Sequence, residues 1–357
     1  MLKKKVFIHV LGARPNFIKA SPIFQALNQY NIDNHILHTG QHYDFGMSEQ
    51  FFDELSLPKP FHNLNIGSHS HGTQTGRMLE GVEKTLINNK VDYVVTYGDT
   101  NSTVAGALAA VKLNIPVAHI EGGVRTKNIK SPEEINRRIC DHISSINFAP
   151  TVTSNNNLLN EGIPMNKTLF SGDVMFDMVV KTKRLKPLSI DIPENFVLAT
   201  IHRQENTDNL ETLKSIFNSL INLSSNISIL MPLHPRTKNK MVEADIYNKI
   251  KGKIKLIDPQ GYRSLLFLIK ASKLVVSDSG GVPKEAAFLG KQSIFIGENI
   301  VWSELLDQKW TKLVQPKNID KLEFFFKKII KKEAPSKLSS FGDGKASVKI
   351  ADFLSRV

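Results

Sequence analysis

The chain has 357 residues, an ordinary globular composition and a formal charge of +12, from 46 Lys and Arg against 34 Asp and Glu. This length favours two domains with ample hydrophobic cores. The charge alone would permit nucleic-acid binding, but no recognised nucleic-acid motif accompanies it, and an anionic small-molecule substrate with a lysine-rich surface explains the charge at least as well.

The N-terminal segment is basic and then apolar over residues 6–11. This apolar run is too short for a secretion signal and leads directly into a Gly-Ala-Arg-Pro turn, so it predicts a first strand followed by a helix. Arg14 and Lys19 then lie beside a helix N-terminus, where an anion binds favourably. No run of about 18 apolar residues occurs, so no membrane span is expected.

Four histidines follow in a region rich in Gly and Ser: His42, His62, His69 and His71. The pair at 69 and 71 has neither a nearby cysteine nor a spaced histidine partner, so no metal site is expected. A mobile loop that covers a binding site suits this composition better.

A βαβ unit at residues 91–126 is the centre of the prediction. An apolar strand over 91–95 ends in a polar turn that contains Asp99, an alanine-lined helix follows, and a second strand over 115–120 ends at Glu121. Parallel sheets bind ligands outside the carboxyl ends of their strands, so both acids are candidates for chemistry. The alternative for each acid is a helix or turn cap.

The next helix begins at Ser131-Pro132 and carries Glu133 and Glu134 in its first turn. Acidic side chains in the first turn interact favourably with the helix dipole, which accounts for one of them without any chemistry. The other is a candidate functional acid. Cys140, on the same helix, is predicted to be a buried small hydrophobe. As the only cysteine it excludes an internal disulfide and favours a reducing compartment, hence a cytoplasmic protein.

Residues 181–194 are predicted to be a linker to a second set of strands. A strand over 196–201 ends at His202, and a strand over 274–276 ends in the Ser279-Gly280-Gly281 turn, whose amides could bind a pyrophosphate. That turn opens a helix with Glu285. A lysine-rich amphipathic helix is expected over 321–332, and the last helix, 346–354, is expected to pack back on the first domain.

Several of these blocks together resemble the non-hydrolysing UDP-N-acetylglucosamine 2-epimerase family. The blocks are GARPNFIKASP, TGQHYD, GDTNSTVAGALAA, HIEGGVRT, PEEINR, FAPT, GDVMFD, HRQENTDN, HPRTK, DPQGY, SDSGGVPKEAAFLGK and GDGKAS. The resemblance implies an α/β fold with two Rossmann-like doubly wound domains that face a cleft, as in GT-B-like proteins. It also implies a homodimer, inversion at C2 of a UDP-linked 2-acetamido sugar for surface polysaccharide synthesis, and no cofactor.

The residue patterns predict the domain boundaries, and the resemblance assigns the roles of the domains and the site residues. The N-terminal domain (1–180) would carry the catalytic acids, the linker would be 181–194, the UDP-binding domain 195–340, and the C-terminal helix 341–357. The implied catalytic residues are Asp99, Glu121, Glu133 and His202. The implied substrate-binding residues are Arg14, Lys19, Gln260, Ser279, Gly280, Gly281 and Glu285.

The chain departs from the family pattern in places. Ala13 and Asn16 stand where Thr and Glu are usual, Gly122 replaces an Ala, and the loop at 297–304 lacks the usual Arg and Thr-Glu. Three alternatives therefore stay open: a hydrolysing epimerase, a retaining glycosyltransferase of similar build, and a non-catalytic UDP-sugar binding protein. The sugar could be N-acetylglucosamine or a 2,3-diacetamido or uronic acid relative.

Overall fold

The computed structural model describes residues 4–41, 49–126, 128–182, 190–335 and 338–357. The chain folds as two units: unit 1, Met1–Lys181 with Ser339–Val357, and unit 2, Thr182–Leu338. His42 and residues 183–189, half of the predicted linker, lie outside the described residues.

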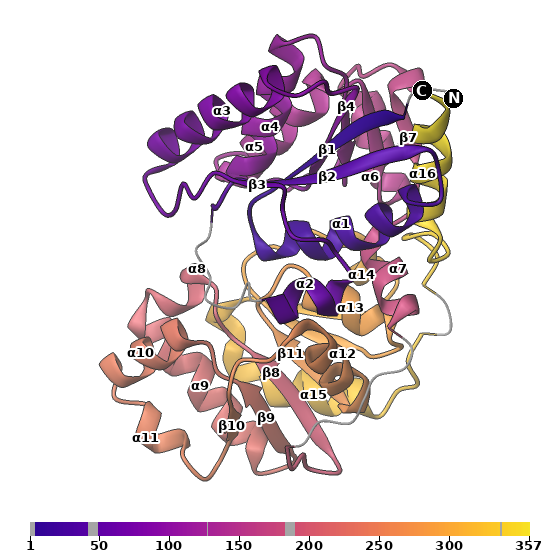
Figure 1. Ribbon diagram of the computed structural model, residues 1–357. Coiled ribbons are helices and arrows are strands. Elements are labelled where there is room, and N and C mark those ends of the chain that lie inside the picture. The colour runs from indigo at the N-terminus through magenta and orange to yellow at the C-terminus, as the bar shows by residue number, and fades with distance from the viewer. Residues whose placement is uncertain (1–3, 42–48, 127, 183–189, 336–337) are drawn as a thin grey trace. The chain divides into compact units, whose positions relative to one another are not determined.

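Unit 1 is built on a parallel sheet with the strand order β3-β2-β1-β4-β5-β6-β7 (Figure 1). Its strands are β1 (Lys5–Leu11), β2 (Ile32–His38), β3 (His62–Asn63), β4 (Tyr93–Tyr97), β5 (Val117–Ile120), β6 (Ile146–Ala149) and β7 (Thr168–Phe170). Its helices are α1 (Arg14–Leu27), α2 (Glu49–Leu55), α3 (His71–Ile87), α4 (Asn101–Lys112), α5 (Pro132–Ile143), α6 (Val152–Asn160), the 3-10 helix η1 (Met165–Lys167), α7 (Val174–Lys181) and α16 (Ala346–Arg356). The central strands are buried and mostly apolar because helices cover both faces of a parallel sheet, with the histidines His9 on β1 and His119 on β5 among the buried polar residues.

The predicted strands of unit 1 are present, with shifted ends. The strand expected over 115–120 begins only at Val117, directly after Pro116, which has no N–H to donate to a sheet ladder. The strand expected over 91–95 runs instead from Tyr93 to Tyr97. This later end places Asp99 two residues beyond the strand.

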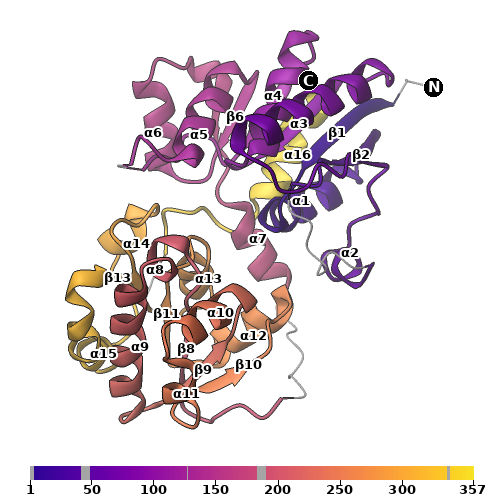
Figure 2. The same ribbon diagram turned by 90° about the vertical axis from the view of Figure 1, so that its left-hand side faces the viewer.

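The C-terminal helix α16 packs against α1 and α7 of unit 1 (Figure 2). Asp177 on α7 binds its first turn, because the carboxylate accepts bonds from the N–H of Ala346 at 3.0 Å, the N–H of Ser347 at 2.7 Å and the Ser347 hydroxyl at 2.6 Å. A buried carboxylate at a helix N-terminus satisfies amides that have no partner within the helix. The C-terminal helix is thereby attached to α7 of unit 1.

Unit 2 has a parallel sheet in the order β10-β9-β8-β11-β12-β13, which repeats the order of the first six strand positions of unit 1. Its strands are β8 (Phe196–Thr200), β9 (Ser228–Pro232), β10 (Lys255–Ile257), β11 (Leu274–Ser277), β12 (Ser293–Ile296) and β13 (Thr311–Val314). Its helices are α8 (Gln204–Thr207), α9 (Leu210–Ser224), α10 (Pro235–Glu243), α11 (Tyr247–Ile250), α12 (Tyr262–Ala271), α13 (Val282–Phe288), α14 (Ser303–Asp307), the 3-10 helix η2 (Pro316–Lys321) and α15 (Leu322–Ile330). The helix expected over 321–332 is therefore shorter: Lys321 precedes α15, and Lys331 and Lys332 follow it.

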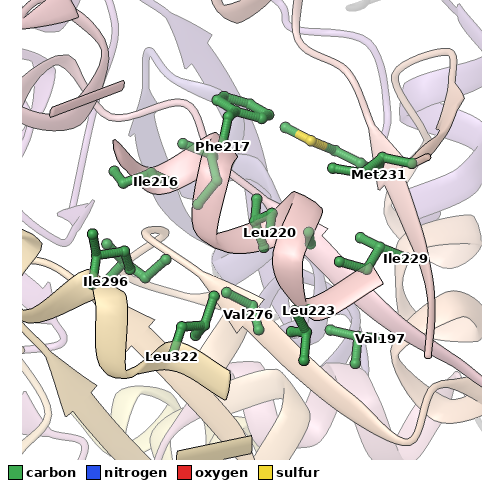
Figure 3. Close-up of a cluster of buried hydrophobic side chains, with 14 of the residues drawn as sticks. Val197, Ile216, Phe217, Leu220, Leu223, Ile229, Met231, Val276, Ile296 and Leu322 are labelled. Carbon is green, nitrogen blue, oxygen red and sulfur yellow. The ribbon is translucent and has the colours of Figure 1, made fainter. Parts of the chain in front are cut away.

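Helix α9 supplies one side of the core of unit 2 (Figure 3). The residues labelled there are Val197, Ile216, Phe217, Leu220, Leu223, Ile229, Met231, Val276, Ile296 and Leu322. The α9 residues among them recur at intervals of three and four, which places them on one helix face. Burial of a side chain of this size stabilises the fold by about 1.5–3 kcal/mol.

Each sheet has a topological switch point, where the connections leave adjacent strands in opposite directions. In unit 1 this point lies between β1 and β4, and in unit 2 between β8 and β11. Ligands of doubly wound sheets bind outside the carboxyl ends of the strands at such points. The predicted fold class, with two Rossmann-like units, is confirmed, and the residues that follow these four strands are the first place to look for a site.

Candidate active-site residues in the two units

The turn after β4 is shaped by a glycine in the left-handed region. Gly98 has a φ of 67°, its N–H donates to the carbonyl of Ile120 at 2.9 Å, and Asp99 follows it. A Cβ at this position would lie 2.9 Å from Nζ of Lys19. The lack of a side chain at Gly98 therefore lets the Lys19 ammonium lie against the turn.

Lys19 and Glu121 form an ion pair at this edge. Nζ lies 2.8 Å from Oε1, and the two side chains are only 12% and 9% exposed. Burial lowers the pKa of Lys19, but the charges of Glu121 and Asp99 outweigh it and raise that pKa above its ordinary value, so the ammonium keeps its charge. Glu121 has a φ of 74°, which is rare for a residue with a side chain and costs on the order of 1 kcal/mol.

Asp99 pairs with Arg137 of α5, whose Nη2 donates to Oδ2. The Asn136 side chain donates to the Asp99 carbonyl at 2.9 Å, so α5 binds both the side chain and the backbone of this residue. Arg137 also lies 3.3 Å from Glu134. Both acids predicted from the strand ends thus have a cation as their immediate partner.

The buried face of α5 is mainly polar. Its buried residues are Glu134, Asn136, Arg137, Cys140 and Asp141. Ile135 and Ile139, in contrast, are 48% and 39% exposed. Cys140 is buried as predicted, but sequence reasoning missed the ionic character of the face around it. The signal that could have found this face is the spacing of Glu134, Arg137 and Asp141 at i, i+3 and i+7.

Arg125 connects α5 to the loop after β5. It donates to both carboxylate oxygens of Glu161, at 2.8 and 2.6 Å, and to Oδ2 of Asp141 at 2.7 Å. Asp141 also accepts the N–H of Gly123 at 3.1 Å. Burial raises the pKa of Asp141, but its hydrogen bond and charge interaction with His119, and those with Arg125, outweigh it and hold that pKa below its ordinary value. These ion pairs fix the loop that follows Glu121.

Glu133 occupies a different environment from the other two predicted acids. It is exposed in the first turn of α5. The carboxylate of the neighbouring Glu134 is fully buried, and it accepts the N–H of Thr126 at 3.0 Å. Unit 1 therefore brings Asp99, Glu121 and Lys19 together, and the catalytic role of Glu133 stays a prediction.

In unit 2, a buried carboxylate organises the turn after β8. Asp278, which follows β11, accepts the N–H of His202 at 3.0 Å, the N–H of Arg203 at 2.9 Å and Nδ2 of Asn206 at 3.1 Å. The His202 side chain is 43% exposed, and its ring lies 6.3 Å from that of His234. Asp278 thus fixes the backbone while the imidazole remains accessible.

The other predicted contacts of unit 2 lie around β11 and α13. Residues 279–281 are half-buried directly before α13, Glu285 is buried within it, and Gln260 donates to the carbonyl of Asp258 at 2.7 Å. Sequence reasoning assigned no role to Asp278, His234, Lys284 or Trp302. The last two form a pair that holds the altered loop at 297–304, because Nζ of Lys284 lies 3.7 Å from the ring centroid of Trp302. The Trp302 indole donates to the Gly280 carbonyl at 3.0 Å.

Among the described residues, no group of three His, Cys, Asp or Glu side chains is placed to hold a metal ion. His69 lies 2.9 Å from Arg77, His71 lies 3.2 Å from Asn101, and His62 is exposed. Within the same part of the chain, no helix has both the length and the apolarity to cross a membrane.

The close approach at Gly98 generates a stability prediction. Gly98→Ala should destabilise unit 1 by about 1–2 kcal/mol through the backbone strain alone, and by more because the new Cβ displaces Lys19 from its ion pair. Gly162→Ala is the matched control, since Gly162 has a φ of 83° with nothing within 4 Å of the added Cβ. Urea denaturation of both variants makes the comparison. An equal loss of unfolding free energy in both variants would show that the contact between the new Cβ and Lys19 costs nothing.

Comparison with known proteins agrees with this arrangement. Residues 25–355 match the family model described as UDP-N-acetylglucosamine 2-epimerase. A Methanococcus maripaludis protein named UDP-N-acetylglucosamine 2-epimerase homolog is 44% identical, over 97% of this chain and 98% of that protein. A Pseudomonas aeruginosa protein named UDP-2,3-diacetamido-2,3-dideoxy-D-glucuronate 2-epimerase is 40% identical, over 98% of this chain and 99% of that protein.

A solved structure gives the same result. The crystal structure of the Methanocaldococcus jannaschii UDP-GlcNAc 2-epimerase, in complex with UDP-GlcNAc and UDP, matches with a TM-score of 0.91 at 41% identity, covering 99% of this chain and 100% of that chain. The likeness therefore extends over nearly the whole chain, including both sheets. On this basis the chain belongs to the UDP-N-acetylglucosamine 2-epimerase family, a family of isomerases.

Proposed function

We propose that this protein inverts C2 of a UDP-linked 2-acetamido sugar by eliminating UDP and adding it back, without net hydrolysis. The observation that carries the proposal is the placement of two carboxylates, Asp99 and Glu121, after adjacent strands of unit 1, each beside a cation. Membership of the epimerase family and the names of its relatives support the same reaction.

The chemistry requires acids and cations of this kind. The C2 hydrogen of the sugar is not adjacent to a carbonyl, so its direct removal is very slow near neutral pH. Departure of UDP from C1 creates oxocarbenium character, which acidifies the C2 hydrogen and lets a carboxylate remove it to form a glycal. Return of a proton to the opposite face requires a second acid, and readdition of UDP to C1 restores the glycosidic bond.

In this proposal unit 1 performs the proton transfers. Asp99 and Glu121 exchange protons with C2, and Glu133 is the third candidate acid. Arg14 and Lys19 stabilise the leaving pyrophosphate, an electrostatic effect worth about 3 kcal/mol for a well-placed donor. Glu121 already binds Lys19, so an incoming pyrophosphate would offer that ammonium a second anion.

Unit 2 would bind the nucleotide. The exposed ring of His202 and the amides of residues 279–281 are the proposed pyrophosphate contacts, with Glu285 at the ribose hydroxyls and Gln260 as a further contact. Asp278 supports this assignment, because its hydrogen bonds fix the His202 backbone at the switch point of the sheet.

The homodimer and the role in surface polysaccharide synthesis remain expectations from the family resemblance, and the cytoplasmic location remains an expectation from the single cysteine. That the reaction needs no cofactor is likewise an expectation from the family resemblance.

The first test is of the reaction itself. In deuterium oxide the wild type should place solvent deuterium at C2 of the product, because the proton removed is not the proton returned. Asp99→Asn and Glu121→Gln should each lower kcat by about a hundredfold or more while the fold is retained. Product without label would exclude the elimination mechanism. Release of free sugar would identify a hydrolase, and transfer to an acceptor a glycosyltransferase.

The second test addresses His202. His202→Ala should weaken both UDP affinity and turnover, since the variant loses a cationic or hydrogen-bonding group at the pyrophosphate. His62→Ala, a change at an exposed histidine of β3, is the control for loss of an imidazole as such. Calorimetric titration with UDP makes the measurement. Unchanged UDP affinity together with a lower melting temperature would assign His202 a structural role.

The third test concerns the sugar. The loop at 297–304 has fewer polar groups than the family pattern, and a relative at 40% identity is named for a 2,3-diacetamido glucuronate. We therefore expect kcat/KM to be higher for a UDP-2,3-diacetamido sugar or its uronic acid than for UDP-N-acetylglucosamine. This ratio measures differential binding of the transition state. Equal or better turnover of UDP-N-acetylglucosamine would exclude this preference.

A further inference from the structure

His119 of β5 lies behind the two acids with both ring nitrogens engaged. Nε2 lies 2.8 Å from the carbonyl oxygen of Gly98, and Nδ1 lies 2.9 Å from Oδ1 of Asp141. The side chains of His119 and Asp141 are fully buried. Because a carbonyl oxygen has no proton to donate, Nε2 must carry the proton of that hydrogen bond.

The second ring nitrogen faces an ionised carboxylate. Asp141 already accepts from Arg125 at 2.7 Å and from the N–H of Gly123 at 3.1 Å, and its lowered pKa keeps it charged. An ionised carboxylate also has no proton to donate, so Nδ1 must be the donor. Burial lowers the pKa of His119, but the hydrogen bond and charge of Asp141 outweigh burial and raise it.

The ring connects the ends of the two strands that carry the acids. Gly98 is bound on both sides, by Ile120 at its N–H and by His119 at its carbonyl, and Asp99 is the next residue. His119 itself precedes Glu121 by two positions on β5. A shift of the imidazole would therefore move the Gly98–Asp99 turn relative to Glu121.

We propose that His119 is held as an imidazolium ion and acts as a positioning residue, which fixes Asp99 relative to Glu121 and contributes positive charge behind both. The inference rests on the proposed epimerase function and deepens it. The other charged or titratable groups of this cluster are Lys19 on α1, Arg125 in the loop after β5, and Arg137 and Cys140 on α5.

Another buried histidine provides the internal comparison. His9 on β1 bonds to the hydroxyl of Tyr97 at 2.6 Å and to Asn34 at 3.2 Å, and no carboxylate among the described residues bonds to it. Burial lowers its pKa to about 4, so its ring is neutral near pH 7. The carboxylate of Asp141 is thus the feature that distinguishes the charged ring from the neutral one.

The first measurement reads the charge directly in the full-length wild type. Nitrogen NMR of protein labelled at the histidine rings should show two protonated nitrogens for His119 near pH 8, with the signals assigned by their loss in His119→Asn, or in His119→Gln if the first variant does not fold. One unprotonated ring nitrogen in the wild type overturns the proposal, whether or not turnover is found. Absence of C2 inversion by the wild type is the separate failure of the proposed function.

The second measurement separates positioning from stability. Asp141→Asn keeps the size of the side chain but removes the charge that holds the ring protonated, so kcat should fall about 10- to 100-fold with KM changed less than about threefold. Without the carboxylate, burial leaves the ring neutral, and it regains a proton only as the pH falls. The ratio of variant to wild-type kcat should therefore rise from about pH 8 to about pH 6.

His9→Asn is the control for loss of a buried histidine from the same sheet. It should lower the melting temperature and leave kcat unchanged. If His119→Asn and Asp141→Asn behave in the same way as His9→Asn, with lower stability, unchanged kcat and a ratio that does not vary with pH, His119 is a structural residue and the positioning role is wrong.

Discussion

Buried charge at the carboxyl ends of β4 and β5 is the constraint on which the functional edge of unit 1 depends. A buried charge is tolerated only beside a partner, and removal of one partner typically costs about 3–5 kcal/mol. Glu121 therefore requires Lys19 from α1, and Asp99 requires Arg137 from α5. Two helices far apart in sequence, α1 and α5, thus each supply a cation to this edge of the sheet.

This requirement explains why α5 buries a polar face and exposes Ile135 and Ile139. The face must supply Arg137 to one acid, and it also supplies Asp141, which binds His119 and the loop after Glu121. In the proposed reaction a substrate pyrophosphate would compete with Glu121 for the Lys19 ammonium.

The amino-acid sequence predicted those parts of the site that depend on neighbours along the chain. Asp99 and Glu121 could be predicted because each follows an apolar β-branched run and a turn signal, and both lie at the predicted edge. The spacing of Arg137 and Asp141 places them on one helix face, but it does not show that this face is buried, and their partners lie far away in sequence. His119 was missed because a buried strand histidine has no local pattern that indicates its partners. The pairing of Lys284 with Trp302 was missed for the same reason. The fold class needed only the order of strands and helices, which the periodicity of apolar residues supplied.

The two sheets share a strand order, yet their switch-point acids have different environments. Asp278 follows β11 as Asp99 follows β4, but Asp278 is fully buried and its carboxylate accepts from the turn after β8 and from α8, whereas Asp99 is 22% exposed and has Arg137 beside it. A fully buried carboxylate whose oxygens accept backbone N–H groups is inaccessible to a substrate, so it supports its neighbours. An acid that is partly exposed can meet a substrate and exchange a proton with it. Asp99 is therefore accessible enough for the proposed proton chemistry, whereas Asp278 supports the proposed nucleotide contacts through the backbone that it binds.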